Sequence, residues 1–360
     1  MEPMRHTLAV LLSLALVASC GDGSKKAADS GTPAQSTTSG ADLTGAGATF
    51  PYPLYSKWFN EYAVKRGVKI NYQSIGSGGG IRQLSEQTVD FGATDAPMSD
   101  AELAKAKGGP VLHVPTVLGA VVIIYNMPEL TQPLKLNGET IAAIYQGQIT
   151  KWNDARIAAL NPGASLPAKD ILVVHRSDGS GTSYVFTDYL AAVSPAWAAK
   201  PGKGKEVQWP VGLGAKGNEG VAGQVKQTPG AVGYAELAYA TQNKLSTASV
   251  ANAAGEYVAP TIASVTAAAA GASASLPATT DYRVSIVNAP GKGVYPISSF
   301  TWIIVSEKQT SAEKGKKLVD FLRWALSDGQ AMASPLDYAP LPDAMRAALV
   351  ARLGTIQIPQ

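Results

Sequence analysis

Apolar runs typical of buried strands alternate along the chain with stretches whose apolar residues recur at helical spacing. The runs that predict strands are Val68–Gln73, Val111–Val114, Val117–Tyr125, Ile171–Val174 and Trp302–Val305, with a short strand expected inside Val89–Pro97. The predicted helices are Pro53–Lys65, Ile81–Gln87, Asp100–Ala106, Gly138–Tyr145, Asp154–Leu160, Ser183–Val193, Gly217–Gln227, Ala312–Leu326 and Asp343–Arg352. The alanine-rich stretch Ala263–Ala274 fits either a helix or irregular structure. This alternation predicts an α/β fold.

The first twenty residues have the pattern of an export signal. Arg5 and His6 precede an apolar stretch, Leu8–Val17, and small residues follow up to Cys20. The stretch is shorter than the ~20 apolar residues that a membrane-spanning helix needs. Val17–Cys20 is similar to a bacterial lipobox, and a lone cysteine cannot form an internal disulfide, so we expect Cys20 to carry a lipid. The alternative is an ordinary signal peptide with an incidental cysteine.

Composition divides the remainder into a tether and a folded part. Residues 21–42 are rich in Ser, Thr, Gly, Ala and Lys and lack aromatic residues, which predicts a flexible tether. The folded part then begins near Leu43 and is long enough for two cores. The net charge of +3 is spread along the chain, and no basic block interleaved with aromatic residues suggests nucleic acid.

Three short segments rich in Gly, Ser and Thr have the pattern of a turn that leads from a strand into a helix: Gly45–Pro51, Gly76–Gly80 and Arg176–Thr182. The N-terminus of a helix presents unpaired N–H groups and a partial positive charge, which together favour anions. In the first segment Thr49 is expected to cap a helix that has proline in its first turn. One such turn is common in any protein, but three in one chain predict an anion site at the carboxyl ends of the strands.

The third segment also supplies a full charge. Arg176 offers a planar guanidinium that matches the oxygens of a phosphate group, and Ser180 and Thr182 offer hydroxyl donors. The combination predicts a site for a tetrahedral oxyanion.

These segments together resemble the periplasmic phosphate-binding proteins of bacterial phosphate ABC transporters. Seven stretches occur in the family's order and carry the likeness: Leu43–Pro51, Gly76–Gly80, Val89–Pro97, Arg176–Thr182, Trp209–Asn218, Pro229–Tyr234 and Leu336–Pro342. The likeness extends from Leu43 to the C-terminus and is weakest over residues 248–283.

The resemblance implies a two-lobed periplasmic-binding-protein fold with a hinge and a ligand cleft between the lobes. One lobe would comprise residues 43–117 and 296–360, and the other residues 118–295. The phosphate ligands implied are Thr49, Phe50 (through its backbone N–H), Ser77, Asp95, Arg176, Ser180, Gly181 (through its backbone N–H) and Thr182. Asp178 would pair with Arg176 and hold the guanidinium.

Asp95 would select the ligand. Without the resemblance, its position in the sequence favours a turn residue or a helix cap over a ligand. A carboxylate repels an anion unless the anion brings a proton, and phosphate near neutral pH carries at least one P–O–H whereas sulfate carries none. The repulsive element would therefore exclude sulfate.

The resemblance further implies capture of inorganic phosphate outside the cytoplasmic membrane, in the periplasm or at the cell surface, and delivery to the transmembrane permease subunits of an ABC importer. No cofactor, metal or nucleic acid is expected. A receptor for another tetrahedral oxyanion is the nearest alternative.

A phosphate-ester hydrolase is a weaker alternative. Ser77 and Ser180 lack the glycines two residues away on both sides that mark a nucleophile elbow. His113 lies in an apolar strand and is expected in the core, and His175 has no carboxylate at a telling spacing. Gly212–Gly217 fits the dinucleotide pattern GxGxxG but follows a poor strand end, so we predict no nucleotide site and no enzymatic activity.

Overall fold

The computed structural model describes residues 40–273 and 281–360, so the predicted signal peptide, Cys20 and most of the predicted tether lie outside the described residues. The strands are β1 (Leu43–Gly47), β2 (Ile70–Ser74), β3 (Phe91–Thr94), β4 (Val111–Tyr125), β5 (Lys135–Leu136), β6 (Leu172–Arg176), β7 (Leu213–Ala215), β8 (Ala231–Glu236), β9 (Ser246–Thr247), β10 (Ser249–Ala251), β11 (Tyr257–Val258) and β12 (Ser298–Ser306).

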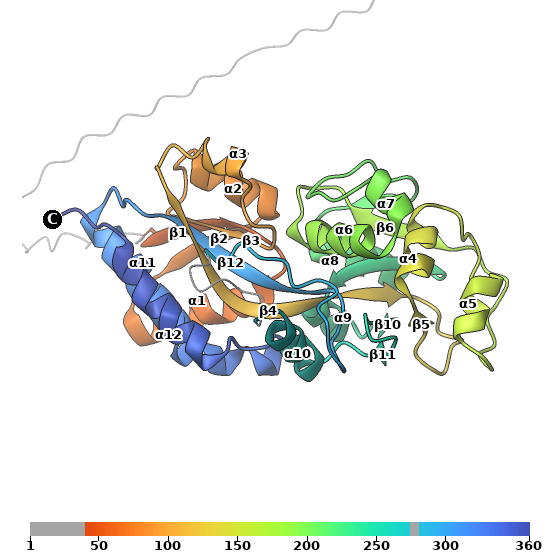
Figure 1. Ribbon diagram of the computed structural model, residues 1–360. Coiled ribbons are helices and arrows are strands. Elements are labelled where there is room, and N and C mark those ends of the chain that lie inside the picture. Colours follow the sequence, from red (N-terminus) through yellow and green to blue (C-terminus); the bar gives the residue numbers. More distant parts are fainter. Residues whose placement is uncertain (1–39, 274–280) are drawn as a thin grey trace, which may run out of the picture. The chain divides into compact units, whose positions relative to one another are not determined.

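The helices alternate with these strands, as expected for an α/β fold (Figure 1). They are α1 (Tyr52–Arg66), α2 (Ser77–Ser85), α3 (Asp100–Leu103), α4 (Gly138–Tyr145), α5 (Ala155–Leu160), α6 (Gly181–Val193), α7 (Pro195–Ala199), α8 (Gly217–Gln227), α9 (Leu237–Asn243), α10 (Ile262–Ser273), α11 (Ala312–Ala325) and α12 (Asp343–Arg352), with 3₁₀ turns at Asp328–Met332, Ser334–Leu336 and Leu353–Thr355.

One long sheet has the strand order β2-β1-β3-β12-β4-β8-β6-β7, with β9 also paired to β4, and a small sheet has the order β11-β10-β5. β1 is parallel to β2 and β3, and β6 is parallel to β7 and β8. β12 and β4 are antiparallel to their neighbours and stand between the two parallel groups.

β4 joins the two groups of strands. Its first part pairs with β12, and its last part, Val121–Tyr125, pairs with β8 (Figure 1). The sequence pattern predicted two strands separated at Pro115, which is wrong. Proline cannot donate to the ladder and is tolerated where pairing is irregular, and here the register shifts so that Trp302 lies opposite Pro115 and Thr301 opposite Val117. Thr116 is therefore the extra residue of a β-bulge.

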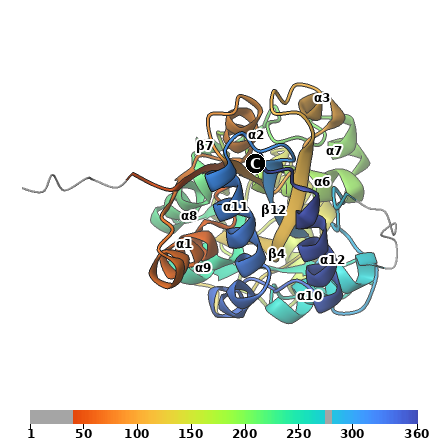
Figure 2. The same ribbon diagram turned by 90° about the vertical axis from the view of Figure 1, so that its left-hand side faces the viewer.

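An aromatic core covers one face of the first parallel group. Phe321 of α11 contacts Phe59 and Tyr62 of α1, with ring centroids 5.5 and 5.2 Å away, and Phe91 of β3 at 6.4 Å. α1 and α11 accordingly lie next to each other in front of the sheet in Figure 2. Apolar and polar residues are only weakly separated around α1, but its aromatic side chains each bury a large apolar area and so hold the helix on the sheet.

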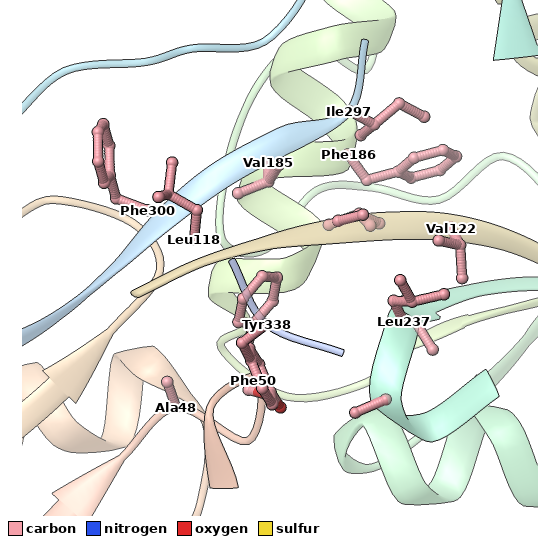
Figure 3. Close-up of a cluster of buried hydrophobic side chains, with 14 of the residues drawn as sticks. Ala48, Phe50, Leu118, Val122, Val185, Phe186, Leu237, Ile297, Phe300 and Tyr338 are labelled. Atoms are coloured by element: carbon pink, nitrogen blue, oxygen red, sulfur yellow. The ribbon is translucent and has the colours of Figure 1, made fainter. Parts of the chain in front are cut away.

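A second aromatic core lies around α6 and β8. Phe186 stacks on Tyr234 at 4.3 Å, and Tyr145 meets Phe186 edge-on at 4.8 Å. Near the junction between the two groups, Phe50 and Tyr338 lie together beside β4 (Figure 3), with ring centroids 6.4 Å apart. Both are fully buried, so the turn after β1 is anchored in the core.

Most predicted elements are confirmed, and the exceptions are informative. α2 begins at Ser77 and α6 at Gly181, each earlier than predicted. Glycine is a poor helix former, so the pattern placed both helix starts after the glycines. The stretch left open between helix and irregular structure forms α10. Within the described residues, no helix is long and apolar enough to cross a membrane.

Candidate functional site

The predicted ligand residues follow strands whose carboxyl ends meet at one edge of a sheet. Thr49 and Phe50 follow β1, Ser77 opens α2 after β2, and Asp95 directly follows β3. Because β1, β2 and β3 are parallel, these residues are brought to the same edge. All eight predicted residues are buried: Thr49, Phe50, Ser77, Asp95, Arg176, Ser180, Gly181 and Thr182.

The N-terminus of α6 brings donors from the second parallel group. The Ser180 hydroxyl accepts from the Ser183 N–H at 2.9 Å, so its hydrogen is available to another acceptor. As the first residues of the helix, Gly181 and Thr182 have N–H groups without an acceptor inside it. A Cβ on Gly181 would lie 2.3 Å from Ser77 Oγ and 2.5 Å from Asp95 Oδ2. Only glycine permits this approach, which places the helix N-terminus directly against the turns after β2 and β3.

Arg176, the last residue of β6, is held by Asp178. Its Nε donates to Asp178 Oδ1 at 2.7 Å and its Nη2 to Oδ2 at 2.5 Å. Its Nη1 donates to Thr182 Oγ1 at 3.3 Å. Burial raises the pKa of Asp178, but the hydrogen bonds and charge of Arg176, together with backbone hydrogen bonds that include the Gly217 N–H, outweigh burial and leave that pKa below its ordinary value. The pair stays ionised, and Nη1 and Nη2 each keep one further N–H for another acceptor.

Asp95 is a nearly isolated acid among these donors. Thr301 Oγ1 donates to Asp95 Oδ1 at 2.8 Å, and Ser77 Oγ lies 3.4 Å from Oδ2 while accepting from the Asp95 N–H at 3.1 Å. Burial raises the pKa of Asp95 to about 7, although Thr301, Arg176 and Ser77 each act to lower it. The carboxyl therefore changes charge near neutral pH, and it can either accept a shared proton or supply one.

The turn after β1 differs from the prediction. α1 begins at Tyr52 with Pro51 as its N-cap and no side-chain cap, so the expected capping role of Thr49 is wrong. Thr49 Oγ1 instead accepts from Nδ2 of Asn218 at 2.7 Å. The Tyr239 hydroxyl donates to the Thr49 carbonyl at 2.6 Å. Since this carbonyl shares a peptide group with the Phe50 N–H, that bond polarises the N–H toward an anion.

A hollow leads from the surface to Asp95. Ser99, Glu102, Lys205 and Arg283 are among the residues that line it together with Asp95. Lys205 Nζ lies 2.7 Å from Glu102 Oε1 across it, and the Lys205 carbonyl accepts the Ser180 N–H at 3.0 Å. The loop that carries Lys205 therefore contacts both the mouth of the hollow and the buried donors.

The histidines form no catalytic arrangement. His113 is buried in β4, where its Nε2 accepts from the Met98 N–H at 3.1 Å, and burial lowers its pKa to about 4. The expectation of a core histidine is confirmed. His175 stacks on Trp209 with ring centroids 4.9 Å apart, and its Nδ1 lies 2.9 Å from the Arg176 carbonyl oxygen. Within the described residues, no three His, Cys, Asp or Glu side chains are grouped so that they could hold a metal ion.

Comparison with known proteins agrees with this geometry. Residues 32–329 match the model of the PBP superfamily domain. The chain is 46% identical over 311 residues to the phosphate-binding protein PstS of Xylella fastidiosa, covering 86% of this chain and 84% of the relative. It is 46% identical over 308 residues to PstS of Pasteurella multocida, covering 85% and 88%.

This chain belongs to the PstS family of phosphate-binding proteins. Solved structures share the fold at lower identity. A periplasmic phosphate-binding protein named PfluDING matches with a TM-score of 0.68 and 22% identity, covering 86% of this chain and 93% of that protein. A phosphate-binding protein from Stenotrophomonas maltophilia matches with a TM-score of 0.66 and 22% identity, covering 87% and 94%. The family predicted from the sequence and the α/β periplasmic-binding-protein fold are both confirmed, and these relatives are named as binding proteins, not enzymes.

Sequence reasoning missed two buried residues that contact the predicted PstS-type site, Asn218 and Thr301. Asn218 follows Gly217 at the start of α8, after β7, so it occupies a fourth strand–glycine–helix turn that the pattern could have revealed. Thr301 is a buried polar residue inside an otherwise largely apolar strand. A buried polar side chain needs a partner, but its partner Asp95 is 206 residues away in the sequence.

Proposed function

We propose that this protein captures inorganic phosphate outside the cytoplasmic membrane and delivers it to the permease subunits of a phosphate ABC importer. The observation that supports this function is the composition of the buried site. Helix N-termini, hydroxyls and the Arg176 guanidinium are the donors, and Asp95 stands among them as a carboxyl that is not paired with a cation, unlike Asp178. The donors serve any tetrahedral oxyanion, whereas the carboxyl favours an anion that brings its own proton. The phosphate-binding relatives, at 46% identity over most of the chain, support the same ligand.

The proposed ligands are the eight predicted residues in their predicted roles. Arg176 would supply charge, with Asp178 holding its guanidinium. Ser77, Ser180 and the threonines would donate through hydroxyls, and Phe50 and Gly181 would donate through N–H groups. No residue in this set is arranged to attack phosphorus, so turnover of phosphate esters is not part of the proposal.

Calorimetric titration of the purified protein, stripped of bound ligand, tests the ligand. We expect stoichiometric binding of phosphate, much weaker binding of sulfate near neutral pH, and no product released from phosphate esters. Tighter binding of sulfate than of phosphate would favour the alternative oxyanion receptor, and ester turnover would favour the hydrolase.

We also propose that the site closes by hinge bending between a lobe of residues 43–117 and 296–360 and a lobe of residues 118–295. The ligands come from both segments, and direct contacts join them: the Gly78 N–H donates to the Gly179 carbonyl at 2.8 Å, and Lys205 pairs with Glu102. A ligand that contacts both lobes favours the closed state. X-ray scattering should give a smaller radius of gyration with phosphate than without it, and equal values at saturation would contradict the hinge.

Lipid attachment at Cys20 completes the proposal for localisation, in the periplasm or at the cell surface. Its support is the lipobox-like sequence Val17–Cys20. Intact-mass measurement of the protein from its native membrane should show an acyl modification at Cys20, and the Cys20→Ser variant should lack it. An unmodified cysteine in the mature protein, or cleavage at another position, would contradict the anchor.

A further inference from the structure

Asn218 contacts two of the predicted ligands, although it is not one of them. It is fully buried in the first turn of α8. Its Nδ2 donates to Thr49 Oγ1 at 2.7 Å and to Thr182 Oγ1 at 3.0 Å, and its backbone N–H also donates to Thr49 Oγ1, at 3.2 Å. One amide group thus bonds to two of the hydroxyls proposed to hold phosphate.

The orientation of this amide is determined by its other end. Asn218 Oδ1 accepts the Glu236 N–H at 2.9 Å, a backbone group that can only donate. The oxygen must therefore face Glu236, and the NH₂ group must face the threonines. A flipped amide would place two donors against each other.

The consequence concerns the hydrogen atoms of the two threonines. A hydroxyl has two lone pairs and one hydrogen. Both lone pairs of Thr49 Oγ1 are occupied by donors from Asn218, and those of Thr182 Oγ1 by Asn218 Nδ2 and Arg176 Nη1. No bond in which either hydroxyl is the donor is found among residues 40–273 and 281–360, so both O–H groups remain available to a ligand that accepts.

We infer that Asn218 is a positioning residue that turns the Thr49 and Thr182 hydroxyls into obligate donors toward the bound anion. A free hydroxyl rotates and can present either its hydrogen or a lone pair to the ligand. Because donors already occupy both lone pairs of each hydroxyl, the hydroxyl cannot turn a lone pair toward the anion, an orientation that would place two acceptors face to face. This inference rests on the proposed phosphate site, and it assigns Asn218 no contact with the ligand.

Two other roles make different predictions. Asn218 could act as a latch, since it joins Thr49 of the first proposed lobe to the second lobe; a latch acts through Thr49 alone. It could instead be a packing residue only, in which case its loss would be independent of either hydroxyl. The bond between Asn218 and Thr182 distinguishes the positioning role from the latch. Both residues belong to the same proposed lobe, so this bond does not depend on closure.

Two double-mutant cycles test the inference with the full-length protein, stripped of ligand and titrated with inorganic phosphate at constant ionic strength. The first combines Asn218→Ala with Thr49→Val, and the second combines Asn218→Ala with Thr182→Val. Valine keeps the shape of threonine and removes the hydroxyl. Asn153→Ala, at an exposed asparagine, is the matched control, and thermal melting checks that each variant folds.

We expect Asn218→Ala to weaken phosphate binding roughly tenfold or more, because two donors lose their orientation. In either valine background the same substitution should cost at least about threefold less, since residues that act through one hydrogen-bond network are not additive. Coupling to Thr49 but not to Thr182 would replace the positioning role with a latch. Additive effects with both, or unchanged affinity in Asn218→Ala, would overturn the inference.

A second variant covers the case in which Asn218→Ala does not fold. Asn218→Asp keeps the shape and the acceptor for Glu236, but both of its oxygens accept, so the threonine hydrogens should turn away from the ligand. Asn218→Asp should lose more phosphate affinity than Asn218→Ala, and the loss should be smaller when Thr182 is replaced by valine. An equal loss with threonine and with valine at position 182 would show that only the added charge matters, and it would overturn the inference. A parallel titration with sulfate separates this inference from the proposed function. If the wild-type protein prefers sulfate, phosphate capture is contradicted. The same double-mutant cycles, measured with sulfate, would still decide the role of Asn218.

Discussion

In its proposed role, Asp95 should make the choice between phosphate and sulfate depend on pH. Burial raises the pKa of this carboxyl to about 7. Sulfate carries no proton over the working range, so in this role it would be accepted only when Asp95 is protonated and donates. Phosphate can bring the shared proton itself. The protein should therefore bind sulfate better as the pH falls, whereas phosphate binding should change much less over the same range.

The magnitude follows from the fraction of Asp95 that is protonated. With a pKa of about 7, that fraction is about nine-tenths near pH 6, about one-tenth near pH 8 and about one-hundredth near pH 9. If only the protonated form accepts sulfate, its affinity falls roughly tenfold between pH 6 and pH 8, and roughly tenfold more by pH 9. Burial lowers the pKa of His113 to about 4, so this histidine stays neutral over the range, and burial also lowers the pKa of His175 below its ordinary value.

Paired calorimetric titrations of the wild-type protein and Asp95→Asn with both anions, at constant ionic strength, provide the assay. The amide can turn its NH₂ group toward sulfate at any pH, so the variant should bind sulfate more tightly than the wild type above pH 7 and with no pH dependence. Its phosphate affinity should fall only modestly, because the amide oxygen still accepts. Asp320→Asn, on the exposed side of α11, is the control. Sulfate affinity that is flat with pH in the wild type, or a sulfate-to-phosphate ratio that does not rise in Asp95→Asn, would refute the role of Asp95.

Three further predictions concern the site and the core. Arg176→Lys should weaken phosphate binding roughly tenfold or more in calorimetry, against roughly twofold to tenfold for Thr182→Val, because charged hydrogen bonds contribute more than neutral ones and lysine lacks the fork; equal losses would contradict this ranking. Thr301→Val removes a donor that lowers the pKa of Asp95, so the plot of sulfate affinity against pH should move about one unit to higher pH, while Thr301→Ser should leave it in place. An unmoved plot in the valine variant would count against the contact. Phe321→Ala should lower the free energy of unfolding in urea by roughly 3–5 kcal/mol, since it opens a cavity among buried rings, and leave the phosphate affinity of the folded protein unchanged; a loss below about 1 kcal/mol would mean that the core collapses around the gap.

Local sequence determined much of the architecture. The alternation of apolar runs and helical spacing predicted the α/β class, and it predicted α4, α8 and α12 with the bounds that the structure has. These signals are local, because helical spacing and strand propensity act over a few residues. The three glycine-containing turns were visible for the same reason, and the family resemblance rested on them.

Only the tertiary structure decided how those turns work together. Pattern alone split β4 at Pro115, because the bulge that admits the proline is set by pairing with β12, far along the chain. It made Thr49 a helix cap, although its hydroxyl bonds to Asn218, 169 residues away. Thr301 and Asp95 are 206 residues apart and meet only because β12 lies beside β3. Strand order and register determine such contacts, and neither is encoded in the neighbourhood of any one residue. The sequence therefore determined which chemical groups the site could use, and the packing of distant strands decided which way each of them points.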